Sequence, residues 1–176
     1  MDIHEYQAKE ILAQYGVKIA EGGLAHTVEE AVQRSREIDG NVWVVKAQIH
    51  SGARGKAGGK THPEVEAAAG SLLGKKLVTH QTGAAGKLCS KLYIEAGTDI
   101  ARELYLSFLI DRSHERIIMV GSAQGGMEIE RLAVTDPDAI IKIHIEPAVG
   151  LQDFQARTMA FALGLGEEDG TCNGTS

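Results

Sequence analysis

Lys46 and the glycine-rich segment that follows it are the residues of this sequence best suited to chemistry. Lys46 lies inside an apolar run, and four glycines fall within residues 50–59, together with Arg54 and Lys56. Glycines let backbone N–H groups approach oxygen atoms closely, and the cations supply positive charge. This combination favours a polyphosphate ligand. We interpret the segment as one wall of a nucleotide site, with the loop acting as a flexible flap over the phosphates.

Two structural explanations of these residues stay open at this point. A lysine on the polar face of a strand is usually solvated, and a glycine-rich segment can be a mobile surface loop. The segment does not match G-x-x-x-x-G-K-[ST], because Ala57 stands where the second glycine would fall after Gly52, and it does not match G-x-G-x-x-G. The pattern therefore disfavours a P-loop or a dinucleotide-binding fold.

A second group of candidate residues is acidic and lies between residues 92 and 103. A strand is expected to end just after Glu95, Gly97 allows the chain to bend, and another strand is expected to begin near Glu103. A planar base could lie against such a hinge, and a carboxylate just beyond it could accept hydrogen bonds from ribose hydroxyl groups. The spacing is equally typical of turn and solvent-facing charges at Glu95, Asp99 and Glu103.

The histidines and cysteines give no comparable signal. None of the seven histidines has a partner at the i, i+2 or i, i+4 spacing of metal ligands, and His144 is expected on the polar face of a strand. Cys89 and Cys172 have neither a metal-ligand nor a disulfide-framework spacing. No Ser/His/Asp or Cys/His arrangement is evident, so we assign neither a catalytic nucleophile nor a metal ligand to this chain.

The composition and charge of the chain exclude some classes of protein and some kinds of binding partner. The chain has 176 residues, 43% of them hydrophobic, and a net charge of −6, which argues against nucleic acid as the main partner. It has no apolar run of roughly 18–20 residues and no apolar signal segment at its start. We therefore expect a cytoplasmic protein that binds a small molecule and has no membrane partner.

Helices are expected to alternate with antiparallel strands, which predicts an α+β fold rather than a doubly wound parallel sheet. The first helix should begin at a capping box formed by Asp2 and Glu5, and Gly16 should end it. Other helices are expected over 27–40, 64–73, 127–132 and 153–163, and strands over 42–49, 77–81, 92–96, 103–110, 116–122 and 140–145. Residues 1–165 should form one domain, and residues 166–176, which lack an apolar period, should be a disordered tail.

Several motifs of this chain resemble the β subunit of succinate–CoA ligase, in register from residue 1 to about 165. The segments that carry the resemblance are Met1–Lys9, Val44–His50, Gly55–Gly59, Leu77–Thr82, Glu95–Ala96, Thr98–Ala101, Glu103–Leu106 and Gly125–Glu130. The resemblance implies an ATP-grasp fold, in which two α+β lobes clamp ATP or ADP. It also implies that this chain works with an α subunit, whose histidine carries the phosphoryl group, so that no catalytic residue is expected here.

The same resemblance implies a role for seven residues at the nucleotide. Lys46 would contact the phosphates, and Ala53, Arg54 and Gly55 would lie in the loop over them. Glu95 and Thr98 would lie at the base-binding hinge, with Glu103 at the ribose. In that family an ADP-forming ligase converts ATP, succinate and CoA to ADP, phosphate and succinyl-CoA.

Two departures from the family pattern affect these expectations. Ala53 stands where family members usually have glycine. Family members also continue beyond this length, with an Asn and an Asp that hold Mg²⁺ and then a CoA-ligase α/β domain. The resemblance therefore implies an ATP-grasp domain that is incomplete at its C-terminal side and doubtful activity of this chain alone. The large subunit of malate–CoA ligase and a non-catalytic nucleotide-binding module remain alternatives.

Overall fold

The computed structural model describes residues 3–51, 56–79, 82–126 and 129–166, and Lys56 only in its backbone. The chain divides into two compact units, Met1–Asp99 and Ile100–Ser176, which are described separately below. Both units combine helices with antiparallel sheets, so the α+β prediction is confirmed. In the part of the chain that the structure describes, no helix combines the length and the apolar character needed to cross a membrane. The predicted tail lies almost entirely outside the described residues.

The first unit is built on a four-stranded antiparallel sheet with the strand order β1-β6-β2-β3. These strands are β1 (Gly22–Ala25), β6 (Leu92–Ala96), β2 (Trp43–Ala47) and β3 (Lys56–Gly59). A separate two-stranded sheet pairs β4 (Lys76–Leu77) with β5 (Lys87–Leu88). Of the predicted strand over 77–81, Leu77 belongs to β4 and pairs with Lys87, whereas Val78 and Thr79 lie in no strand and residues 80–81 lie outside the described residues.

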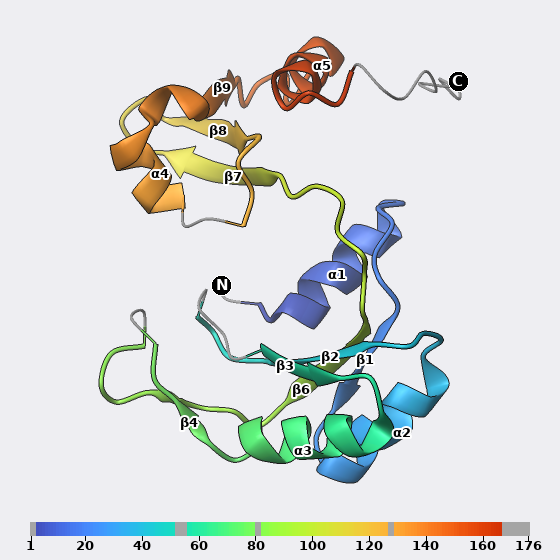
Figure 1. Ribbon diagram of the computed structural model, residues 1–176. Coiled ribbons are helices and arrows are strands. Elements are labelled where there is room, and N and C mark those ends of the chain that lie inside the picture. The colour runs from blue at the N-terminus through green and yellow to red at the C-terminus, as the bar shows by residue number, and fades with distance from the viewer. Residues whose placement is uncertain (1–2, 52–55, 80–81, 127–128, 167–176) are drawn as a thin grey trace. The chain divides into compact units, whose positions relative to one another are not determined.

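The described residues of the first unit also form three helices: α1 (Glu5–Gln14), α2 (Val28–Glu37) and α3 (His62–Leu72). Figure 1 shows α2 and α3 against one face of the sheet and α1 on the other side. The alternation of β2 explains the core, because Trp43, Val45 and Ala47 are buried among residues of α2, α3 and β6. The opposite face of β2 carries Lys46 toward the side occupied by α1.

Side-chain caps explain where these helices begin. The hydroxyl group of Thr27 accepts a hydrogen bond from the Glu30 backbone N–H at the start of α2 (3.1 Å), as the capping pattern predicted. The predicted start of α1 was wrong, because the helix begins at Glu5 with His4 as its N-cap. The His4 backbone N–H donates to Oε1 of Gln7 (2.9 Å), so a glutamine three residues after His4 replaces the expected pair.

Strand β3 corrects the expected loop over residues 50–59. Its four residues pair antiparallel with β2, with Gly58 opposite Val44 and Gly59 opposite Trp43. A Cβ atom added to Gly58 would lie 2.5 Å from the carbonyl oxygen of Trp43. Close packing of two strands therefore accounts for this glycine, and residues 52–55 of the proposed flap lie outside the described residues.

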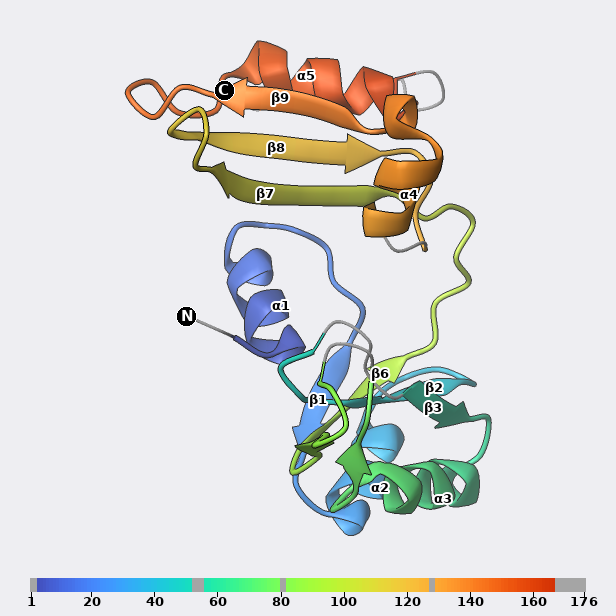
Figure 2. The same ribbon diagram turned by 90° about the vertical axis from the view of Figure 1, so that its left-hand side faces the viewer.

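The second unit is a three-stranded antiparallel sheet with the order β7-β8-β9. Strands β7 (Tyr105–Asp111) and β8 (Arg116–Ser122) form the predicted hairpin, and β9 (Ile141–Ile145) pairs with β8. Helix α4 (Ile129–Thr135) and a 3-10 turn (Pro137–Ala139) precede β9, and α5 (Asp153–Ala162) follows it. Figure 2 shows α5 alongside β9. Met159 and Leu163 pack on Met119 and Ile145 in the core of this unit.

Arg102 joins the start of the second unit to the end of α5. Its guanidinium donates to the carbonyl oxygen of Gly164 (3.0 Å) and to that of Leu163. The last carbonyl groups of a helix lack partners within the helix and carry partial negative charge, so a cation is favourable there. This contact closes the unit between its first and last described segments.

Candidate functional site

Lys46 lies at the centre of a cluster of charged side chains in the first unit. It sits on β2, and its side chain is 16% exposed. Its ammonium group lies 2.9 Å from Oε1 of Glu5 and also contacts the carboxylate of Glu95. The lysine is therefore neither solvated nor unpaired, which the sequence had left open.

Glu95 reaches Lys46 from the neighbouring strand β6. Antiparallel pairing sets Glu95 opposite Val44 and Tyr93 opposite Lys46, so the carboxylate and the ammonium group are diagonal neighbours on one face of the sheet. Glu95 is 5% exposed, and its second carboxylate oxygen contacts Lys9 of α1. Two carboxylates and two ammonium groups thus alternate, and their formal charges cancel.

Lys9 is a member of the cluster whose ionisation is perturbed. Burial, followed by the charge of Lys46, lowers the pKa of Lys9 to about 8, although the carboxylate of Glu5 acts in the opposite direction. The Lys9 ammonium also lies 5.2 Å from the centre of the Tyr93 ring, within cation–π range. Lys9 therefore loses its proton at a pH nearer to the physiological value than an exposed lysine does.

Further contacts fix the beginning of α1 over this face of the sheet. The backbone N–H of Tyr6 donates to Oε1 of Gln48 (3.3 Å), which is itself 2% exposed. The ring of His4 stacks on that of His50, with their centres 4.0 Å apart. Glu5 and Lys9 are consequently held against Lys46 by contacts at the start of their helix.

The structure brings only some of the sequence-predicted residues together. Lys46 and Glu95 are in contact, whereas Thr98 is an exposed residue three positions beyond Glu95. Gly97 directly follows β6, and its N–H donates to the Val42 carbonyl oxygen (2.7 Å), which continues the pairing of β6 with β2 by one residue. Glu103 belongs to the second unit, where it is exposed and its carbonyl oxygen accepts from the Gly125 N–H (3.2 Å). The loop residues Ala53, Arg54 and Gly55 lie outside the described residues.

Sequence reasoning missed Glu5 and Lys9 as members of the cluster. Their i, i+4 spacing on the first helix was visible in the sequence, and it is a common pattern of helix ion pairs. That pattern does not reveal which strand residue the pair will meet. Only the position of α1 on the sheet does so.

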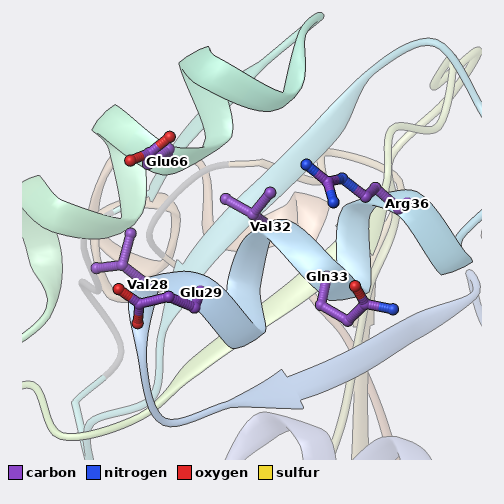
Figure 3. Close-up of a pocket in the computed structure, with 6 residues that line it drawn as sticks. All are labelled: Val28, Glu29, Val32, Gln33, Arg36 and Glu66. Carbon is purple, nitrogen blue, oxygen red and sulfur yellow. The ribbon is translucent and has the colours of Figure 1, made fainter.

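A hollow of about 330 Å³ lies elsewhere, over α2 and α3 (Figure 3). The residues that line it are Val28, Glu29, Val32, Gln33, Arg36 and Glu66. Two carboxylates face it against one guanidinium, so its charge is unfavourable for a polyphosphate. We therefore keep the Lys46 cluster as the candidate anion site.

The sequence matches a known protein family. A family model described as an ATP-grasp domain matches residues 2–173, nearly the whole sequence. The chain belongs to the ATP-grasp family. This agrees with the fold that the sequence motifs implied.

Named relatives of this ATP-grasp chain include subunits of two kinds of CoA ligase. A probable malate–CoA ligase subunit beta from Mesorhizobium japonicum is 56% identical over 169 residues, which are 94% of this chain and 43% of that protein. The ADP-forming succinate–CoA ligase subunit beta of Nautilia profundicola is 54% identical over 173 residues, and that of Bacillus subtilis is 51% identical over 172 residues. The chain thus spans less than half the length of these curated relatives.

Solved structures with the same fold are more distant in sequence. A dinucleotide-forming acetyl-coenzyme A synthetase from Ca. Korarchaeum cryptofilum superposes with a TM-score of 0.65 at 21% identity, covering 93% of this chain and 68% of that one. An ATP citrate lyase from Methanothrix soehngenii gives a TM-score of 0.63 at 19% identity, covering 93% of this chain and 42% of that one. These likenesses support the fold alone.

Proposed function

We propose that this ATP-grasp chain is the nucleotide-binding portion of the β subunit of an ADP-forming succinate–CoA ligase. The identity of 54% to the Nautilia profundicola subunit over nearly the whole chain is the observation that carries the proposal. In the proposed reaction, ATP, succinate and CoA give ADP, phosphate and succinyl-CoA, through a phosphohistidine on a partner α subunit. A cytoplasmic location goes with this proposal.

Lys46 is the residue that we assign to the nucleotide phosphates. Its ammonium group is only slightly exposed, and its contact with Glu5 can be exchanged for a contact with a phosphate oxygen. After the exchange, Lys46 would contact both the phosphate oxygen and Glu95, whose other carboxylate oxygen contacts Lys9. Ala53, Arg54 and Gly55 would cover the phosphates, Glu95 and Thr98 would lie near the base, and Glu103 would bind the ribose.

The described residues next to Lys46 do not fit a magnesium site. Mg²⁺ prefers carboxylate and water oxygens in an octahedral arrangement. The carboxylates of both Glu5 and Glu95 contact ammonium groups, so neither offers its oxygens freely to a cation. We therefore assign no magnesium ligand to this cluster, and the ion would reach the site as a complex with the nucleotide.

The nucleotide assignment is tested by calorimetric titration of ADP and ATP into the full chain and its Lys46→Ala variant. Loss of the ammonium group should cost about 2–4 kcal/mol of binding free energy, which corresponds to a loss of affinity of roughly 30-fold to 900-fold. Lys18→Ala is a matched control, since it removes an exposed lysine of the same unit. Equal affinities of the wild type and Lys46→Ala would refute the role of Lys46.

The ligase assignment needs a separate measurement. Adding a purified α subunit of a succinate–CoA ligase and assaying CoA thioester formation tests whether the chain supports turnover. Nucleotide binding without turnover would favour the alternative of a non-catalytic nucleotide-binding module. The absence of any nucleotide binding would refute both proposals.

Malate is the second candidate substrate. The probable malate–CoA ligase subunit of Mesorhizobium japonicum is 56% identical to this chain, slightly more than the succinate–CoA ligase subunits quoted above. The same assay, run with malate and with succinate in parallel, separates the two acids. A preference for malate would transfer the proposal to that ligase and leave the nucleotide site unchanged.

A further inference from the structure

Asp111, His114 and His144 form a second polar cluster, in the unit that does not contain Lys46. One ligand atom from each residue lies within 4.8 Å of the other two. Oδ2 of Asp111 is 2.8 Å from Nδ1 of His114 and 3.2 Å from Nε2 of His144. The two imidazole rings are tilted by 55°, with their centres 4.9 Å apart. Three potential metal ligands therefore converge on one point.

The cluster is positioned by three different segments of the unit. Asp111 ends β7, His114 belongs to the turn between β7 and β8, and His144 projects from β9. His144 lies opposite Ile118 in the β8–β9 register, on the sheet face away from Ile143 and Ile145, which pack toward α5. The sequence could not reveal this group, because the two histidines lie 30 positions apart.

Asp111 is oriented by its own turn. Oδ1 accepts hydrogen bonds from the backbone N–H groups of Ser113 (3.0 Å) and His114 (3.3 Å), as in an Asx-turn. The second oxygen, Oδ2, is thereby directed at both imidazole rings. Hydrogen bonds of this kind are the outer contacts that orient carboxylate ligands in metal sites.

We propose that Asp111, His114 and His144 bind a divalent transition-metal ion of the zinc class. Imidazole nitrogens and a carboxylate oxygen are the donors that Zn²⁺ prefers, and a set of three leaves a fourth position for water. Tetrahedral ligands at about 2.1 Å from zinc are roughly 3.4 Å apart, close to the 2.8 Å and 3.2 Å between Oδ2 of Asp111 and the two imidazole nitrogens. The two distances from Oδ2 of Asp111 to the imidazole nitrogens need to lengthen only slightly for the ion to bind.

The surroundings are compatible with a bound cation. Arg116 lies opposite Asp111 in the β7–β8 register, but its guanidinium is 3.3 Å from the carboxylate of Glu146, which offsets its charge. Both histidine side chains are exposed, so the ion can enter from solvent. Gln155 of α5 donates to the carbonyl oxygen of His144 (2.8 Å) and holds that end of β9 in place.

The test is calorimetric titration of Zn²⁺ into the full chain, with the visible absorption spectrum of added Co²⁺ as a second readout. We expect one site that depends on the cluster. His114→Ala and His144→Ala should each weaken Zn²⁺ binding at least about tenfold and abolish the tetrahedral Co²⁺ absorption. His26→Ala, which removes an exposed histidine of the other unit, should change neither.

Asp111→Asn separates metal binding from folding. The asparagine oxygen can still accept from Ser113 and His114, so the turn is preserved, but the amide offers no carboxylate to the ion. We expect a folded variant, judged by circular dichroism and thermal unfolding, with weakened Zn²⁺ binding. If Zn²⁺ binds the three variants as tightly as it binds the wild type, or does not bind the wild type at all, the cluster is only a hydrogen-bonded end of a hairpin and the proposal is wrong.

Discussion

Lys46 on β2 and Glu95 on β6 are diagonal neighbours whose charged groups meet on the α1 side of the sheet. The pair is enclosed by Glu5 and Lys9, which belong to one turn of α1. A helix therefore occupies the side of Lys46 from which an anion would approach. Any ligand of Lys46 must compete with a carboxylate that the chain itself supplies.

Replacing Glu5 by Gln should strengthen nucleotide binding if Lys46 contacts the phosphates. The substitution removes a negative charge 2.9 Å from the lysine while keeping the shape of the side chain. We expect ADP affinity to rise roughly 3-fold to 10-fold at low ionic strength, with a smaller gain in high salt. Calorimetric titration measures both. Glu10→Gln removes an exposed charge from the same helix and is the control; weaker ADP binding by Glu5→Gln would contradict this prediction.

Lys9 should make the stability of the first unit depend on pH. The pKa of Lys9 is about 8 in the folded chain, against the ordinary value of 10.5, so between these values the unfolded chain holds more protons. The free energy of unfolding should then rise as the pH increases from 8 toward 10, and Lys9→Met should lose this part of the rise. Urea unfolding followed by the fluorescence of Trp43, the single tryptophan, reports on this unit. An unchanged slope in Lys9→Met, relative to Lys18→Met, would show that Lys9 is not the group responsible.

Two glycine substitutions distinguish close packing from an open position. Gly58→Ala should lower the free energy of unfolding by about 1–3 kcal/mol, because its Cβ atom would press on the Trp43 carbonyl oxygen. Gly70→Ala in α3 has no atom within 4 Å of the added carbon and should stabilise the helix by about 0.5–1 kcal/mol. Urea titrations of the two variants, read by Trp43 fluorescence, should therefore shift in opposite directions. A neutral Gly58→Ala would mean that β3 is not held against β2 in this way.

Strand β7 should promote association between copies of the chain. It is an edge strand of the described sheet, and Leu106, Phe108 and Ile110 form an exposed apolar row on it. Ile110→Lys should lower the fraction of dimer and larger species in sedimentation velocity experiments. Thr158→Lys adds the same charge at an exposed position of α5 and should have little effect. Equal association of the two variants would show that the apolar row of β7 does not cause the association.

The strands and helices were largely predictable because their signals are local. The alternation of β2 correctly separated Trp43 and Val45 from Lys46, and the pattern of Thr27 and Glu30 located the start of α2. Strand β3 was not predicted, because glycine-rich residues are typical of loops, and only the partner strand makes them extended. The start of α1 was misplaced because His4 is a less common N-cap than aspartate.

The candidate sites were less predictable than the fold, for a physical reason. Lys46 and Glu95 could be named from their own segments, but their mutual contact depends on strand register, and the contacts of Glu5 and Lys9 depend on how α1 packs. The same holds for His114 and His144, which are far apart in sequence and meet through the β8–β9 pairing and the turn at Asp111. The predicted roles at the nucleotide remain predictions for all seven residues: Lys46, Ala53, Arg54, Gly55, Glu95, Thr98 and Glu103.

The contact of Arg102 with the last turn of α5 affects how the second unit should respond to proteolysis. A cut near Gly97, before Arg102, would leave the guanidinium still attached to the carbonyl groups that it caps. The released piece would keep the segment before β7 hydrogen-bonded to the end of α5. By contrast, a cut between Arg102 and β7 would separate this cap from α5, which would then be held only by its own packing, with Met159 and Leu163 in the core.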